Sequence, residues 1–103
     1  MSVKELQARL ADSENQPLVL DVREPWECTI CSLPGARQIP MGRIPTSLHE
    51  LDKDKEIIVL CHHGVRSYQV AYYLQHQGFN NLHNLQGGID AWARQIDPAM
   101  PKY

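Results

Sequence analysis

The chain has 103 residues, of which 43% are hydrophobic and 21% are charged, and its formal net charge at pH 7 is -2. A chain of this size supports one ordinary hydrophobic core, so we expect a single domain over residues 1-103. Lysine and arginine are scattered along the chain, which argues against a nucleic-acid-binding or membrane-binding surface.

The sequence also restricts the compartment in which we expect the protein. It has neither a signal segment at its start nor an apolar run long enough to span a membrane. Its three cysteines, Cys28, Cys31 and Cys61, are too few for a disulfide scaffold and suit a reducing environment. We therefore expect a cytoplasmic protein with at least one free thiol.

Local patterns predict alternating helices and strands along the chain. Helical periodicity and capping signals predict helices over residues 3-11, 23-28, 46-51, 65-75 and 89-96. Short apolar runs predict strands over residues 18-22, 36-39, 57-60 and 81-85. We expect Trp26 and Trp92 to be core or half-core anchors, whereas the tail over residues 98-103 should pack irregularly or fray.

This alternation indicates the fold class. Short strands separated by helices are typical of an α/β domain with a mainly parallel central sheet and helices on both faces. Such sheets bind ligands at the carboxyl ends of their strands. Asp21 and Arg23 lie at that end of the first predicted strand, and Cys61 follows the third. We expect these residues to share one edge of the sheet.

The loop Cys-His-His-Gly-Val-Arg, residues 61-66, joins the third strand to a helix. Gly64 allows a tight backbone in which several amide groups point at one centre, beside the positive end of the helix dipole. A thiol at that centre is expected to ionise easily. Arg66, and His62 or His63 when protonated, would add positive potential for an anionic substrate. The loop predicts a nucleophilic cysteine in an anion-binding cradle.

The cysteines have other interpretations. Cys61 could be a small hydrophobic residue that ends a buried strand. Cys28 and Cys31 form a Cys-x-x-Cys pair, which could bind zinc together with Cys61 and a loop histidine, or cycle as a dithiol. A single Cys-x-x-Cys is a weak signal, so structural packing is the preferred interpretation of Cys28 and Cys31.

Residues 61-67 resemble the active-site loop of the rhodanese family, the sulfurtransferases that carry sulfur as a cysteine persulfide. Other segments resemble family motifs in the same order, at residues 20-27, 33-40 and 84-92. The resemblance extends from about residue 18 to residue 92. It implies a single rhodanese-like domain.

The resemblance also implies roles for individual residues. Cys61 would be the nucleophile that accepts sulfur from a donor such as thiosulfate and passes it to cyanide or a thiol, protein thiols included. Two half-reactions of this kind give ping-pong kinetics and require no metal or organic cofactor. The persulfide would lie among the amides of His62, His63, Gly64, Val65 and Arg66. Asp21 and Arg23 would support the loop.

The role of the Arg66 side chain stays open. It can bind the sulfonate oxygens of the donor, or it can pair with an acid such as Asp21 or Glu24 and brace the loop. These two roles predict different responses to its removal, because only the first depends on the charge of the sulfur donor.

The loop is compatible with two other function classes. The loop also resembles that of the cell-cycle dual-specificity phosphatases, in which five residues separate the cysteine from the arginine, whereas four separate Cys61 from Arg66. The shorter loop suits a sulfur atom better than a phosphate or arsenate group. A persulfide relay or a non-catalytic binding module for a protein partner is the second alternative, although inactive rhodanese domains typically lack the loop cysteine.

Overall fold

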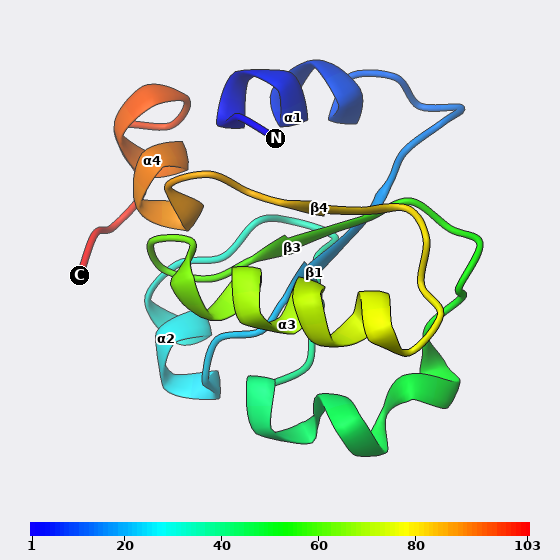
Figure 1. The fold of residues 1–103 in the computed structure, drawn as a ribbon. Coiled ribbons are helices and arrows are strands. Elements are labelled where there is room, and N and C mark those ends of the chain that lie inside the picture. Colours follow the sequence, from blue (N-terminus) through cyan, green and yellow to red (C-terminus); the bar gives the residue numbers. More distant parts are fainter.

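The computed structural model describes all 103 residues and is built around a four-stranded parallel sheet (Figure 1). Its strands are β1 (Leu18–Asp21), β2 (Arg37–Gln38), β3 (Ile57–Leu60) and β4 (Leu82–Asn84). They lie in the order β2-β1-β3-β4, and every neighbouring pair is parallel. The predicted α/β class with a parallel sheet is confirmed, and each strand lies within the residues predicted for it.

Helices cover both faces of the sheet (Figure 1). The α-helices are α1 (Val3–Leu10), α2 (Pro25–Ile30), α3 (Val65–His76) and α4 (Gly88–Gln95). α1 and α4 lie over one face, whereas α3 runs along the other, with α2 beside its N-terminal end. No helix in the protein has both the length and the apolar character needed to cross a membrane.

The predicted helix over residues 46-51 is wrong. The chain instead forms two 3-10 helices, η1 (Met41–Thr46) and η2 (Leu48–Glu50). Pro45 lies inside η1, ahead of the predicted helix, and Ser47 separates the two 3-10 helices with φ -113° and ψ 7°. These angles lie outside the α-helical range, so no continuous α-helix forms over residues 46-51. The hydroxyl of Thr46 donates to the carbonyl of Arg43 at 3.1 Å, within this tighter turn.

The side chains of β3 divide between two hydrophobic cores. Ile57 and Val59 pack in the core that faces α3, while Ile58 and Leu60 pack in the core that faces α1 and α4. Successive side chains of a strand point to opposite faces, so the next residue, Cys61, returns to the α3 side. This alternation is what directs the thiol toward the N-terminus of α3.

The two tryptophans have different environments. Trp92 is buried in the core beneath α4, as predicted. Trp26 is 61% exposed, so its predicted core position is wrong. α2 is only six residues long, and it buries the side chain of Glu27 instead of its tryptophan. The buried carboxylate belongs to the site described next.

Candidate active site

The carboxyl ends of β1 and β3 meet at one edge of the sheet. Asp21 pairs in register with Leu60, and the amide of Val22 donates to the carbonyl of Leu60 at 3.0 Å. The loop that begins at Cys61 therefore lies beside the segment that contains Arg23. The parallel register brings together the two sequence segments from which the site residues were predicted.

α4 fixes the orientation of the loop backbone. The amide of Ile89 donates to the carbonyl of Cys61 at 2.9 Å, and the amide of Asp90 donates to the carbonyl of His62 at 3.1 Å. Gly88 makes this approach possible, because a β-carbon there would lie 2.4 Å from the His62 carbonyl oxygen. The first carbonyls of the loop are thus bound to α4, which leaves the loop amides to face the thiol.

The Cys61 thiol lies inside the loop and its residue is only 1% exposed. Its Sγ accepts a hydrogen bond from the amide of Gly64 at 3.1 Å and lies 3.3 Å from the hydroxyl of Ser67. Burial alone would raise the pKa of Cys61, but hydrogen bonds from Ser67 and from the amides of Ser67, Gly64 and His63 hold it below the ordinary thiol value. The loop can therefore stabilise a thiolate.

Ser67 and Asn84 belong to this site, although the sequence assigned no role to either. The Ser67 hydroxyl forms a short hydrogen bond with Asn84 Oδ1, and Asn84 Nδ2 donates to the carbonyl of Gly64 at 3.1 Å. Both residues lie within motifs that resemble the family, which was the available signal. Their contact depends on β4 lying beside β3, and no local pattern shows that.

The Arg66 guanidinium is bound to the carboxylate of Glu27. Its Nη1 and Nη2 donate to Oε1 and Oε2 at 2.6 Å and 2.7 Å, a two-pronged ion pair. The Arg66 hydrogen bonds are the main cause that lowers the pKa of Glu27 to about 2. Arg66 thus braces the loop in this structure. The predicted acids, Asp21 and Glu24, were wrong, and Glu27 takes that place.

Asp21 and Arg23 form a second ion pair, fully buried, with a distance of 2.7 Å between Arg23 Nη2 and Asp21 Oδ2. The same Nη2 also donates to the carbonyl of Cys31 at 2.8 Å. Burial would lower the pKa of Arg23, but Asp21 and Tyr103 keep it raised. This pair joins the end of β1 to the end of α2 and makes no hydrogen bond to Cys61. We interpret it as indirect support for the loop.

Tyr103 connects the tail to both ion pairs. Its hydroxyl donates to Glu27 Oε2 at 2.6 Å and accepts from Arg23 Nη1 at 3.0 Å. Its ring stacks on the imidazole of His62, with 3.8 Å between the centroids and 8° between the planes. Burial raises the pKa of Tyr103 to about 12, so the phenol stays protonated as a donor. The tail is therefore packed on the site, the first of the two predicted alternatives.

We expect Tyr103→Phe to lower the free energy of unfolding by about 1-2 kcal/mol, because Glu27 and Arg23 would each lose a buried hydrogen-bond partner. Tyr103→Ala should cost more, since it also removes the ring that covers His62. Urea unfolding measures both changes. Tyr73→Phe is the matched control, a half-buried tyrosine whose hydroxyl makes no hydrogen bond within the protein. Equal stability of Tyr103→Phe and wild type would contradict the role of the hydroxyl.

His62, His63 and Asp90 are the side chains that come nearest to a metal-binding cluster, with donor atoms within 4.8 Å of one another. The two imidazoles pack on each other, with 3.9 Å between their centroids and 31° between their planes. Asp90 also accepts from Arg94 at 3.0 Å. Burial, followed by the nearby His63, lowers the pKa of His62. We assign no metal to this cluster.

Cys28 and Cys31 are free thiols that serve packing, and they do not join Cys61 in one site. Cys31 packs against the core beneath α1 and α4, whereas Cys61 belongs to the core on the opposite face of the sheet. Cys28 lies 3.7 Å from Asp21 Oδ2, and burial together with this carboxylate raises its pKa to about 11. This arrangement contradicts the alternative in which one zinc ion would use all three cysteines.

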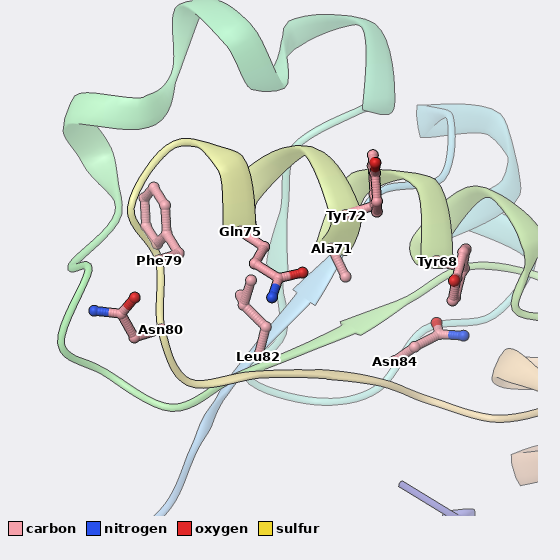
Figure 2. A pocket seen from close by; sticks show the side chains of 8 residues that line it. All are labelled: Tyr68, Ala71, Tyr72, Gln75, Phe79, Asn80, Leu82 and Asn84. Carbon is pink, nitrogen blue, oxygen red and sulfur yellow. The ribbon is translucent and has the colours of Figure 1, made fainter.

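A groove of about 310 Å³ lies outside the loop, between α3 and β4 (Figure 2). Asn84 is at one end of it, beside Tyr68, and Asn80 is near the other end. Cys61 does not line the groove. Asn84 connects the groove to the thiol through hydrogen bonds with Ser67 and Gly64, which both contact Sγ.

Comparisons with known proteins agree with this geometry. The chain is 45% identical over 89 residues to a sulfurtransferase of Allochromatium vinosum, covering 86% of this chain and 82% of that one. A rhodanese-like domain protein of Staphylococcus aureus has a similar structure, with a TM-score of 0.84, 34% identity and coverage of 89% and 88% of the two chains. A rhodanese-related protein of Thermoplasma volcanium has a TM-score of 0.84 at 29% identity, covering 93% and 91%.

The family model described as rhodanese-like domain matches residues 2-95, which is nearly the whole chain. It includes every residue of the cysteine loop, both strand ends beneath it and the helix that binds its carbonyls. On this match, and with the fold and loop geometry that accompany it, the chain belongs to the rhodanese-like domain family.

Proposed function

We propose that this protein is a sulfurtransferase that moves sulfane sulfur from a small anionic donor such as thiosulfate to a thiol or to cyanide, through a persulfide on Cys61. The observation that carries this proposal is the position of Sγ at the end of β3, where it accepts from a loop amide and contacts the Ser67 hydroxyl. These donors favour the thiolate, which is the reactive form of cysteine. Membership of the rhodanese-like domain family supports the same chemistry.

The proposed reaction has two steps. In the first, the Cys61 thiolate attacks the sulfane sulfur of thiosulfate, an S–S bond forms on Cys61, and sulfite leaves with the electron pair of the bond that breaks. In the second, cyanide or an acceptor thiolate attacks the outer sulfur, and Cys61 leaves as the thiolate. Transfer by this route is ping-pong and needs no cofactor.

The amides of the loop are the proposed cradle of the outer sulfur. The first amides of a helix have no acceptor within it, and no backbone carbonyl of this protein accepts from the amides of Val65 or Arg66. Together with the amides of His62, His63 and Gly64, they can bind the negative charge of a persulfide. Glu27 holds the Arg66 guanidinium, so the backbone supplies most of the positive potential in our proposal.

The size of the loop favours sulfur over phosphate as the transferred group. Four residues separate Cys61 from Arg66, and the guanidinium that would hold phosphate oxygens is bound to Glu27. We therefore do not propose phosphatase or arsenate reductase activity. The three free thiols suit a reducing compartment, and we propose the cytoplasm.

The test is intact-protein mass spectrometry of the reduced protein before and after brief incubation with thiosulfate, followed by cyanide. We expect a gain of about one sulfur mass (~32 Da) that maps to Cys61 and disappears with cyanide. The matched control is the same protein after Cys61 has been blocked by alkylation. A folded, reduced protein that gains no sulfur from thiosulfate or from an organic persulfide would overturn the proposal and favour a binding module.

A further inference from the structure

Asn84, the last residue of β4, contacts two parts of the cysteine loop. Its Nδ2 lies 3.1 Å from the carbonyl oxygen of Gly64, and the other end of the amide contacts the hydroxyl of Ser67. A carbonyl oxygen can only accept, so the Gly64 contact shows which end of the amide is nitrogen. Oδ1 therefore faces Ser67, and because Oδ1 also can only accept, the Ser67 hydroxyl is the donor.

The Ser67 hydroxyl has one proton but two neighbours that require it. When it donates to Asn84, the Cys61 thiol can donate its own proton to Ser67 Oγ, 3.3 Å away. When the thiol is ionised, no proton remains between sulfur and oxygen unless the hydroxyl rotates toward the sulfur. Ser67 is fully buried, so water does not replace this proton. The hydroxyl cannot satisfy Asn84 and the thiolate at the same time.

We propose that Asn84 is a positioning residue that draws the Ser67 proton away from Cys61, and that it thereby favours the persulfide over the thiolate. The inference rests on the proposed function. In a persulfide the negative charge lies on the outer sulfur, so the inner sulfur no longer needs a donor and the hydroxyl can return to Asn84. Loading of Cys61 with sulfur then satisfies all three groups, whereas the thiolate leaves Asn84 Oδ1 without Ser67.

The position of Asn84 explains why Cys61 can still ionise at a moderate energetic cost. Asn84 is only half-buried and lines the groove between α3 and β4 (Figure 2). Its amide is therefore near solvent, and water can bind there when Ser67 turns toward the sulfur. A fully buried acceptor would lose its partner outright and would oppose ionisation much more strongly.

The test measures the pKa of Cys61 from the pH dependence of thiolate absorbance, after subtraction of the Cys61→Ser signal. Asn84→Ala is introduced both in the wild type and in Ser67→Ala. If Asn84 acts through the hydroxyl, Asn84→Ala should lower the pKa of Cys61 in the protein that has Ser67. In Ser67→Ala the same substitution should lower it less, with a difference of about half a unit or more between the two shifts. Equal shifts in both backgrounds, or a higher pKa with Ser67 present, would overturn the inference.

Asn84→Ala loses the Gly64 contact both in the wild type and in Ser67→Ala. The difference between the two pKa shifts therefore reports the effect through the Ser67 hydroxyl and excludes general loosening of the loop. Asn84→Asp is the second variant: it still accepts from Ser67, so it should not show the lowered pKa. Asn80→Ala is the matched control, an exposed amide in the same groove. All variants keep the remaining polar groups near the thiol, which are Arg66 with Glu27, His62, His63 and Asp90.

The two proposals fail in different ways. The pKa is measured without any sulfur donor, so a clear coupling between Asn84 and Ser67 in a protein that gains no sulfur would remove the proposed function and the preference for the persulfide, and would leave the effect of Asn84 on the thiol. Sulfur loading of Cys61 without that coupling would remove the role of Asn84 alone.

Discussion

Cys61→Ser should lose sulfur transfer by a factor of roughly 10³ or more, which corresponds to about 4 kcal/mol of transition-state stabilisation. The reason is chemical: a hydroxyl is mostly un-ionised at neutral pH and does not form a stable bond to sulfane sulfur. Initial rates of thiocyanate formation from thiosulfate and cyanide measure the effect. No side chain other than Cys61 has its sulfur among the amide donors of the loop.

The fold of this variant should survive, because the hydroxyl of serine occupies less space than the thiol and can still accept from Gly64. Circular dichroism and the urea midpoint should both stay close to those of the wild type. Cys31→Ser is the matched control, since its thiol packs on the opposite face of the sheet. Substantial turnover by folded Cys61→Ser would show that another group accepts the sulfur.

Glu27→Ala should lower the free energy of unfolding by about 3 kcal/mol, since removing one partner of a buried ion pair leaves the other charge uncompensated. The side chain of Glu27 is 3% exposed and binds Arg66 with both oxygens. It also accepts from Tyr103, so the tail loses a contact at the same time. Glu50→Ala is the matched control, because it breaks the exposed pair with Arg37 and should cost less than about 1 kcal/mol.

Acid titration gives a second readout for Glu27. Its pKa falls from 4.5 to about 2 on folding, so its contribution to stability is fully present above pH 4.5 and is lost as the pH falls toward 2. This shift corresponds to roughly 3 kcal/mol. The unfolding free energy of the wild type should therefore drop more steeply across this window than that of Glu27→Ala. Parallel curves would contradict the assigned ion pair.

The sequence predicted those parts of the fold that local patterns determine. The strands β1 and β3 are apolar runs with clear ends, and the capping box of Ser2 and Glu5 begins α1 as expected. The 3-10 helices were missed because the polar pattern of residues 46-51 is compatible with an α-helix.

The site was predicted where a strand end or the loop itself identifies it, as at Asp21, Arg23 and Cys61. Cys61 and the glycine of its loop were identified from the loop itself, and the Gly64 amide does contact Sγ. Glu27, Asn84 and Tyr103 were not, because each reaches the loop through the packing of a separate element. Tyr103 gave no signal at all, since a single tyrosine in a polar tail is compatible with disorder.

The alternation of side chains along β3 has a consequence for how this protein can evolve. The core that each side chain of β3 enters, and the face on which the thiol lies, both depend on whether the residue is at an odd or an even position of this short strand. Loss or gain of a single residue within β3 would exchange Ile57 and Val59 with Ile58 between the cores and carry the thiol to the face of α1 and α4. The exposed turn over residues 52-55 has no such constraint. Natural length variation should therefore be found in that turn and be excluded from β3, Ile57–Leu60.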